Sequence, residues 1–297
     1  MAEKTKIFLD SGNPQETREI LKSLDFLDGQ TTNPSLIAKS PKIDEVLKRG
    51  EKVSLDEAYK LYKEIITEIS QLLPQGSVSV EVCIDENTSV EKIITEAKEL
   101  FSWIPNAHIK LPITAACLEA AEKLVKMGVR LNLTLCFSQE QAAAVYAATQ
   151  GAYKGQVFIS PFVGRIDDRG ENGMDLIKNI VEMYKNGDGH VEVLTASVRN
   201  LNHFLEGLRL GSDIITVPFK VLTEWIAQEM PMPASLNPPI GGEGGSDENF
   251  VYNSVEFKPI LYQEINLNQD WKNFNISHEL TDVGIKKFIA DWQSFIE

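Results

Sequence analysis

The 297-residue sequence has few cysteines, no long apolar run and few cations for its length. Its three cysteines, Cys83, Cys117 and Cys136, form no CxxC motif, and their odd number predicts free thiols in a reducing compartment. No apolar stretch approaches the about 20 residues that cross a bilayer. Residues 1–10 lack the apolar core of a signal peptide. These absences predict a cytoplasmic protein.

The sequence contains 29 Lys and Arg residues and 43 Asp and Glu residues, which gives a net charge of −14. Binding to the nucleic-acid backbone depends on clustered cations, so this balance argues against a nucleic-acid partner. A small anionic substrate remains compatible with it if a few cations converge. The histidines have no metal spacing, and no GxGxxG follows the first predicted strand. Neither a metal nor an organic cofactor is therefore predicted.

Short apolar runs alternate with amphipathic helical patterns along most of the chain. The eight strand candidates span residues 6–10, 27–31, 77–84, 107–112, 130–135, 156–161, 192–197 and 213–218. The helical patterns span residues 16–24, 54–73, 89–101, 118–128, 138–151, 173–186 and 200–211. Eight right-handed βα units predict an α/β fold, a single (β/α)8 TIM barrel of typically about 250 residues. A doubly wound open sheet is the main alternative, and it usually has fewer strands.

The regular alternation stops after the eighth unit. Residues 231–245 hold four prolines and four glycines, so no regular element is expected there. Residues 250–267 show strand-like alternation, and residues 280–295 are predicted as a C-terminal helix. We therefore expect residues 1–297 to form one barrel domain with an irregular insertion over 231–278. This insertion is interpreted as a surface excursion, or alternatively as a flap or a contact surface in a homo-oligomer.

Polar side chains follow most of the predicted strands, where a TIM barrel carries its functional residues. These residues are Asp10, Asn33, Glu81, Lys110, Asn132, Thr134, Ser160, Arg165, Ser197 and Arg199. Such a set is too polar for packing alone. Its convergence at one end of the barrel predicts a functional site.

Lys110 is the unusual member, because it interrupts an otherwise apolar strand. On the alternating pattern it points away from the face of Ile109 and Leu111, which places it inside the barrel. An amine attacks a carbonyl only when unprotonated, and desolvation lowers the pKa of a buried lysine from its usual value of about 10.4. We interpret Lys110 as a Schiff-base nucleophile; the alternative is a structural lysine paired with a carboxylate. His108, one layer deeper, is expected to be a hydrogen-bonded interior residue.

The other charged residues fit the same chemistry. Carbinolamine formation and C–C cleavage both need groups that move protons, and Asp10 and Glu81 are the carboxylates available. Arg165 and Arg199, together with Ser197, suit a phosphate group, which guanidinium binds in a bidentate manner. The alternative is that the two arginines pair with surface acids.

Seven motifs, taken in order, resemble those of the transaldolase family. They are FLDSGN (8–13), DGQTTNPSLIAK (28–39), HIKLPIT (108–114), NLTLCFS (132–138), ISPFVGRIDD (159–168), TASVRN (195–200) and TVPFKVL (216–222), and residues 280–292 look like the family's C-terminal helix. The resemblance covers nearly the whole chain and implies a TIM barrel in the pentose phosphate pathway. Such an enzyme passes a dihydroxyacetone unit from fructose 6-phosphate or sedoheptulose 7-phosphate to erythrose 4-phosphate or glyceraldehyde 3-phosphate.

The resemblance also implies roles for single residues. It makes Lys110 the Schiff-base lysine and Asp10 the acid/base at the cleaved C–C bond, while Glu81 and Thr134 hold a water that relays protons. It assigns the substrate hydroxyls to Asn33, Asn132 and Ser160, and the phosphate to Arg165, Ser197 and Arg199. No cofactor is implied.

Two positions separate the branches of the family. The related fructose-6-phosphate aldolases release free dihydroxyacetone and typically carry glutamine where Glu81 stands and tyrosine where Phe162 stands. This sequence has the transaldolase residue at both positions. A transaldolase is therefore expected, with an aldolase of the releasing kind as the alternative. A catalytically silent barrel that binds sugar phosphates is a further alternative.

Overall fold

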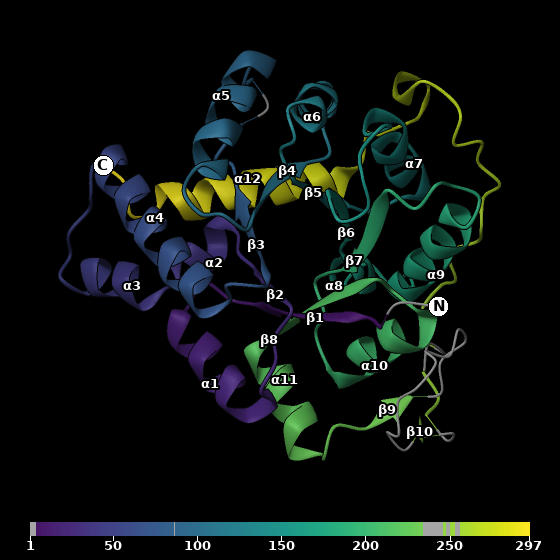
Figure 1. Ribbon diagram of the computed structural model, residues 1–297, viewed down its shortest axis with the longest axis horizontal. Helices are drawn as coiled ribbons and strands as arrows, with labels where there is room; N and C mark the ends of the chain where they lie inside the picture. Colours follow the sequence, from purple (N-terminus) through teal and green to yellow (C-terminus); the bar gives the residue numbers. More distant parts are fainter. Residues whose placement is uncertain (1–3, 86, 234–245, 248–249, 253–255) are drawn as a thin grey trace.

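The computed structural model describes residues 4–85, 87–233, 246–247, 250–252 and 256–297. Eight parallel strands form a closed barrel, in which each strand pairs with the next along the chain and the eighth pairs with the first (Figure 1). The strands are β1 (Lys6–Asp10), β2 (Gly29–Thr31), β3 (Ser77–Glu81), β4 (Ala107–Pro112), β5 (Leu131–Cys136), β6 (Val157–Pro161), β7 (Val191–Thr195) and β8 (Ile214–Pro218). The predicted (β/α)8 barrel is confirmed, and the open sheet is excluded.

The helices surround this barrel (Figure 1). They are α1 (Pro14–Leu24), α2 (Pro34–Ala38), α3 (Pro41–Lys48), α4 (Leu55–Leu72), α5 (Val90–Phe101), α6 (Ala115–Lys126), α7 (Gln139–Ala148), α8 (Val163–Asp167), α9 (Gly173–Tyr184), α10 (Leu201–Leu210), α11 (Phe219–Ala227) and α12 (Glu279–Gln293), with a 3-10 helix, η1 (Trp271–Asn273). Along the described ranges, no helix combines the length and the apolar composition needed to cross a membrane.

Local signals explain where the helices begin and end. Helix α6 begins three residues before the predicted position 118, because the Thr114 hydroxyl accepts a hydrogen bond from a backbone N–H of its first turn. Gly128, Gly151 and Gly211 follow α6, α7 and α10 with φ values of 79°, 89° and 74°. The left-handed conformation favours glycine, so these residues end the helical segments as predicted.

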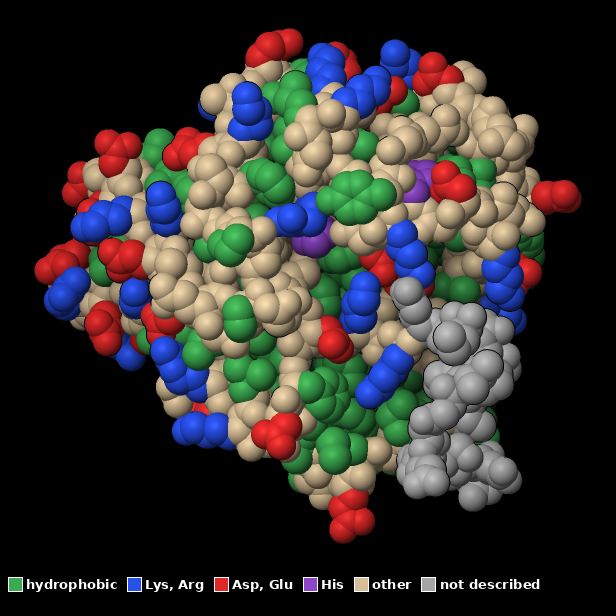
Figure 2. All heavy atoms as spheres, in the orientation of Figure 1, with side chains coloured by type: hydrophobic (Ala, Val, Ile, Leu, Met, Phe, Trp, Pro, Cys, Tyr) green, Lys and Arg blue, Asp and Glu red, His purple; other side chains and the backbone are tan. Residues whose placement is uncertain are grey.

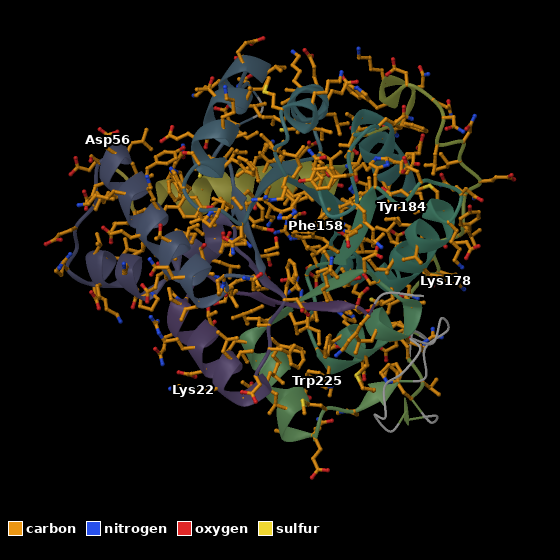
Figure 3. The ribbon with its side chains drawn as sticks, in the orientation of Figure 1. Lys22, Asp56, Phe158, Lys178, Tyr184 and Trp225 are labelled. Atoms are coloured by element: carbon orange, nitrogen blue, oxygen red, sulfur yellow. The ribbon has the colours of Figure 1, made fainter. Side chains whose placement is uncertain are left out.

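Aromatic side chains fill the lower part of the barrel. Phe158 lies at its centre (Figure 3), stacked on His108 with ring centroids 4.1 Å apart. His108 bonds to Ser77 Oγ at 2.7 Å and to the Gly155 carbonyl at 3.0 Å. Burial lowers the pKa of His108 to about 3, so the ring is neutral. The prediction of a hydrogen-bonded interior histidine is confirmed, and this packed layer forms the floor of the site above it.

The predicted insertion contains more regular structure than expected at its start. Met232–Pro233 (β9) pairs in parallel with Ser246–Asp247 (β10), so the expectation of no regular element is wrong there, while residues 234–245 lie outside the described residues. The alternation over 250–267 does not produce a strand in its described part, which forms only an isolated bridge between Glu171 and Lys258. Side chains of the outer helices bind this segment instead.

Two hydrogen-bonded contacts show how the segment is held. The Ile260 carbonyl accepts from Asn179 Nδ2 at 3.0 Å on α9, and the backbone of Gln263 exchanges two hydrogen bonds with the Gln139 amide on α7. Side chains of α7 and α9 therefore bind the backbone of this segment, and within the described residues the segment joins no sheet.

Helix α12 returns the chain to the C-terminal ends of the barrel strands (Figure 1, yellow) and packs against α2 and β5. Thr281 Oγ1 donates to the Leu135 carbonyl at 2.9 Å, and the Ser35 hydroxyl binds the Asp291 carboxylate. Beyond the helix, the Glu297 N–H donates to the Val53 carbonyl at 3.0 Å. The predicted C-terminal helix is confirmed, and it covers part of the barrel mouth.

Candidate active site

Lys110 projects into the barrel from β4. The strand register aligns it with Glu81 of β3 and Asn132 of β5, so the three side chains face the interior at one level. Lys110 Nζ lies 2.9 Å from Glu81 Oε2 and donates to the Thr32 carbonyl at 3.1 Å. The side chains of Lys110 and Glu81 are only 3% and 2% exposed. The sequence therefore placed the lysine correctly, and the structure adds a carboxylate in direct contact with it.

The Glu81 carboxyl has an unusual proton affinity. Burial raises the pKa of Glu81, and the positive charge of Lys110 only partly offsets that effect. A carboxylate with a raised pKa takes a proton more readily than an exposed one. Thr134 Oγ1, one level above Asn132, is buried and has no hydrogen-bond partner among the described residues. An unpartnered hydroxyl at this depth can hold a water or a substrate group.

Asp10 lies at the C-terminal end of β1, next to β2 and β8. Its Oδ1 accepts a hydrogen bond from Thr31 Oγ1 at 2.7 Å, and this hydroxyl is 2.5 Å from Thr216 Oγ1. Burial raises the pKa of Asp10, while the charge of Lys110 and the Thr31 hydrogen bond act in the opposite direction. Sequence reasoning did not single out Thr31 or Thr216 as partners of Asp10, because no spacing signal distinguishes them from other strand threonines.

The predicted hydroxyl-binding residues divide into two groups. Asn132 donates to Ser79 Oγ at 3.1 Å and accepts from Ser160 Oγ at 2.6 Å, which brings Asn132 and Ser160 together in the interior. Asn33 caps α2, where its Oδ1 accepts the Leu36 N–H at 2.9 Å. Asn33 still borders the site, because the residue before it supplies the carbonyl that Lys110 contacts.

Arg165 has the most distinctive surroundings of the predicted anion-binding residues. Its guanidinium carbon lies 5.1 Å from the ring centre of Phe162 and 5.4 Å from that of Phe288 on α12. Across the described residues, its side chain makes no hydrogen bond or ion pair, although it is partly buried. Desolvation lowers the pKa of Arg165 from its high ordinary value, yet the group remains a cation. Its donors are therefore free to bind an anion.

Ser197 and Arg199 follow β7 and lie beside α8, the short helix that carries Arg165. Ser197 adopts a left-handed conformation with φ 60°, and its carbonyl accepts the Gly164 N–H at 3.1 Å. A side chain at Gly164 would place a Cβ 2.4 Å from that carbonyl, so this close approach needs glycine. Arg199 is half exposed and pairs with Asp168 at 2.9 Å, as the alternative interpretation expected. Helix α8, which carries Arg165, and the loop that carries Ser197 are thus neighbours at the barrel mouth.

A small pocket adjoins the lysine–glutamate pair. It has a volume of about 100 Å³ and lies between the end of β3 and helix α12, with Glu81, Phe288 and Trp292 in its lining. Water occupies about 30 Å³ per molecule in the liquid, so this pocket holds a few waters. On the side of α12 its lining is mostly apolar, whereas Asp85, Thr88 and Lys92 supply polar groups on the opposite side.

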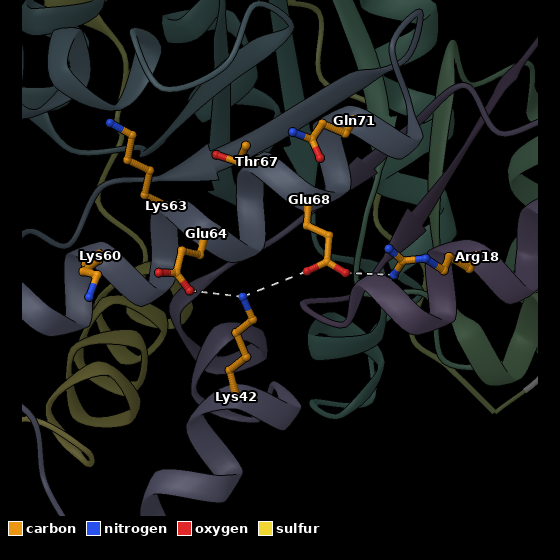
Figure 4. Close-up of a pocket in the computed structure, with 8 residues that line it drawn as sticks. All are labelled: Arg18, Lys42, Lys60, Lys63, Glu64, Thr67, Glu68 and Gln71. Atoms are coloured by element: carbon orange, nitrogen blue, oxygen red, sulfur yellow. Dashed lines mark hydrogen bonds and ion pairs between the residues drawn. The ribbon is translucent and has the colours of Figure 1, made fainter.

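A larger groove of about 640 Å³ lies on the outer helices, away from the strand ends (Figure 4). Within it, Lys42 contacts Glu64 at 3.2 Å and Glu68 at 4.0 Å, and Arg18 contacts Glu68 at 2.8 Å. Because both cations are paired with glutamates, they are not available to bind an anion in this groove. On the face drawn in Figure 2, acidic and basic side chains are likewise interspersed. The described chain also contains no group of three or more His, Cys, Asp or Glu side chains placed to hold a metal.

The fold and the site together define a (β/α)8 barrel with a buried amine–carboxylate pair and a cationic rim at the C-terminal end of its strands. The profile of the family described as Transaldolase/Fructose-6-phosphate aldolase matches residues 7–297. The chain belongs to this family, which confirms the resemblance of the motifs.

Curated relatives align along much or nearly all of the chain. A probable transaldolase of Dehalococcoides mccartyi is 34% identical over 289 residues, which cover 97% of this chain and 98% of the relative. A probable transaldolase of a Thermoanaerobacter species is 39% identical over 74% of this chain and 89% of its own length. A third, from Bartonella henselae, is 41% identical over 73% of this chain and 87% of its own length.

Proposed function

We propose that this protein is a transaldolase that transfers a dihydroxyacetone unit from a ketose phosphate to an aldose phosphate through a Schiff base on Lys110. The observation that carries the proposal is the contact of 2.9 Å between Lys110 Nζ and Glu81 Oε2 inside the closed barrel. Family membership and relatives named probable transaldolase support the same conclusion.

The first step needs a neutral amine. Lys110 transfers a proton to Glu81, whose pKa is raised by burial, and its nitrogen then attacks the C2 carbonyl of the ketose. The resulting carbinolamine loses its hydroxyl as water, and Glu81 returns the proton that this departure needs. The unpartnered Thr134 hydroxyl supports a water in this relay. The product is an iminium between Lys110 and the sugar.

The second step breaks and remakes a carbon–carbon bond. The Asp10 carboxylate takes the proton of the C4 hydroxyl, the C3–C4 bond breaks, and its electron pair enters the iminium to form an enamine. An aldose phosphate leaves. The enamine carbon then attacks the aldehyde of the acceptor, and Asp10 gives its proton to the new hydroxyl. Hydrolysis of the second iminium releases the product ketose and restores Lys110.

The remaining site residues bind the sugar phosphate. The free donors of Arg165, with Ser197 and Arg199 on the neighbouring loop, support phosphate binding at the mouth. Arg199 must share or leave Asp168 to take part. Asn33, Asn132 and Ser160 are proposed to bind the substrate hydroxyls below, close to Lys110.

Two residues favour transfer over release of free dihydroxyacetone. Release requires protonation of the enamine carbon, and the Phe162 ring beside Arg165 has no hydroxyl to supply a proton or orient a water. Glu81 provides a carboxylate for the proton relay where the releasing aldolases typically have glutamine. The enamine is therefore expected to react with an aldehyde acceptor before its carbon is protonated.

Acceptor dependence tests the proposal. The protein is incubated with fructose 6-phosphate, with and without erythrose 4-phosphate, and release of glyceraldehyde 3-phosphate is followed. We expect sustained turnover only with the acceptor. Sustained turnover without it, with free dihydroxyacetone as product, would support the releasing aldolase instead. If neither mixture shows turnover but phosphate raises the thermal stability, the result would support the catalytically silent barrel that binds sugar phosphates.

We also infer that residues 1–297 form a single domain and that the protein acts in the cytoplasm. Helix α12 and the described part of the insertion both pack on the barrel, which supports one domain. The three cysteines are free thiols, and two of them are buried, which supports a reducing compartment. The proposed partners are small sugar phosphates.

A further inference from the structure

Helix α12 presents one face to the phosphate-binding arginine. Gly284 and Phe288 are four residues apart, so they lie on the same side of the helix. A Cβ built on Gly284 would be 2.7 Å from Arg165 Nη1 and 2.7 Å from a side-chain carbon of Leu135. The Phe288 ring lies under the guanidinium carbon at 5.4 Å. Gly284 thus leaves the space that Arg165 occupies, and Phe288 contacts the face of its guanidinium.

The helix is fixed in this position by contacts that do not involve Arg165. Thr281 Oγ1 donates to the Leu135 carbonyl and accepts from Gln141 Nε2 at 2.9 Å, which ties the start of α12 to the end of β5 and to α7. Near its other end, Asp291 binds the Ser35 hydroxyl of α2. Hydrogen bonds near both ends of α12 therefore fix the orientation of the helix face that contacts Arg165.

We propose that Gly284 and Phe288 are positioning residues that hold the Arg165 guanidinium ready for the phosphate of the substrate, and so make the enzyme prefer phosphorylated sugars. This inference rests on the proposed function. Contacts with ring faces leave the N–H groups at the edge of the guanidinium unused, and those groups bind a phosphate. A side chain that is already held in place loses less conformational freedom when the anion binds.

The test measures phosphate affinity in the full-length protein, separately from turnover. Inorganic phosphate binding is followed by calorimetry for the wild type and for Phe288→Leu, Phe288→Tyr and Gly284→Ala. Val283→Ala is the matched control, because Val283 lies on the same helix and is 50% exposed. We expect Phe288→Leu to weaken phosphate binding by about tenfold, since loss of one desolvated cation–π contact has about that effect. Phe288→Tyr keeps the ring and should bind like the wild type.

Gly284→Ala provides an independent variant if Phe288→Leu does not fold. Alanine favours a helix more than glycine does, so this change supports the helix itself while its methyl group displaces the guanidinium. For both variants we expect a raised KM for fructose 6-phosphate with kcat changed by less than the KM. Borohydride trapping of unphosphorylated dihydroxyacetone on Lys110 should be unchanged.

Two results would overturn the inference. One is phosphate affinity equal to the wild type in folded Phe288→Leu and Gly284→Ala. The other is an equal loss of affinity in Val283→Ala, which would indicate a general effect of disturbing the helix. Failure of the proposed function has a different signature, namely the absence of a borohydride adduct on Lys110 while the variants still differ in phosphate affinity.

Discussion

Removing the amine of Lys110 should make the stability of the protein depend on pH in a defined way. In Lys110→Met, Glu81 keeps its buried position at 2% exposure but loses the cation at 2.9 Å. Breaking a buried ion pair by removing one partner costs about 3–5 kcal/mol of unfolding free energy. We expect a loss of this size at pH 8, measured by urea unfolding at fixed pH and referred to the wild type.

The sign of the pH dependence follows from the pKa of Glu81. Burial already raises this pKa in the wild type, and the variant removes the charge that opposes the rise. Between the unfolded value of about 4.3 and the higher folded value, the folded state of Lys110→Met holds one proton more than the unfolded state. Its stability therefore falls by up to about 1.4 kcal/mol for each pH unit of increase in that window. At pH values below the unfolded pKa, Glu81 is protonated in both the folded and the unfolded state. The loss of unfolding free energy that comes from burying the unpaired Glu81 charge is then absent.

A second variant provides the control. Adding Glu81→Gln to Lys110→Met removes the titrating group, so the fall in stability with rising pH that Lys110→Met shows should be absent from the double variant. A deficit in Lys110→Met that stays constant between pH 5 and pH 8 would refute the reasoning. It would mean that Glu81 is not held as a buried charge by Lys110.

Three further predictions follow from the contacts around the site. Asp10→Asn should lower kcat by about 10²–10⁴-fold, as expected for loss of an acid/base group, while Lys110 still forms a borohydride-trapped adduct; loss of the adduct would contradict the assigned role. Thr31→Val removes a hydrogen bond that stabilises the Asp10 carboxylate, so the acid limb of the kcat/KM profile should move to higher pH, and a move to lower pH would be inconsistent with this. Thr281→Val leaves the Leu135 carbonyl and the Gln141 amide without this partner, so urea unfolding should show a loss of about 1–3 kcal/mol, and unchanged stability would argue against the contact.

The barrel was predictable because its signals are local. Alternation in HIKLP fixes the side of the strand on which Lys110 lies, and glycines such as Gly128 and Gly211 mark helix ends. Eight such units in sequence leave few topologies to choose from. The same local signals failed over residues 250–267, where side chains of α7 and α9 bind the backbone and the described part forms no strand.

The contacts of the site were less predictable, because they depend on the register of the closed barrel. No sequence spacing shows that Glu81 and Lys110 are aligned on neighbouring strands, or that the Thr31 hydroxyl lies between Asp10 and Thr216. The position of Phe288 near Arg165 depends on how α12 docks after a long insertion. Such long-range contacts have no local signature. Strand-end positions grouped Asp10, Glu81 and Lys110 in advance, but nothing in the sequence connected Thr31, Thr216 or Phe288 to them.

Trapping the covalent intermediate tests the central claim most directly. The protein is incubated with fructose 6-phosphate, reduced with borohydride, digested and mapped by mass spectrometry, with Lys220→Met as a control at another lysine near a strand end. We predict a single substrate-dependent adduct on Lys110, absent in Lys110→Met and retained in Lys220→Met. An adduct on a different lysine, or none in the wild type, would contradict the account.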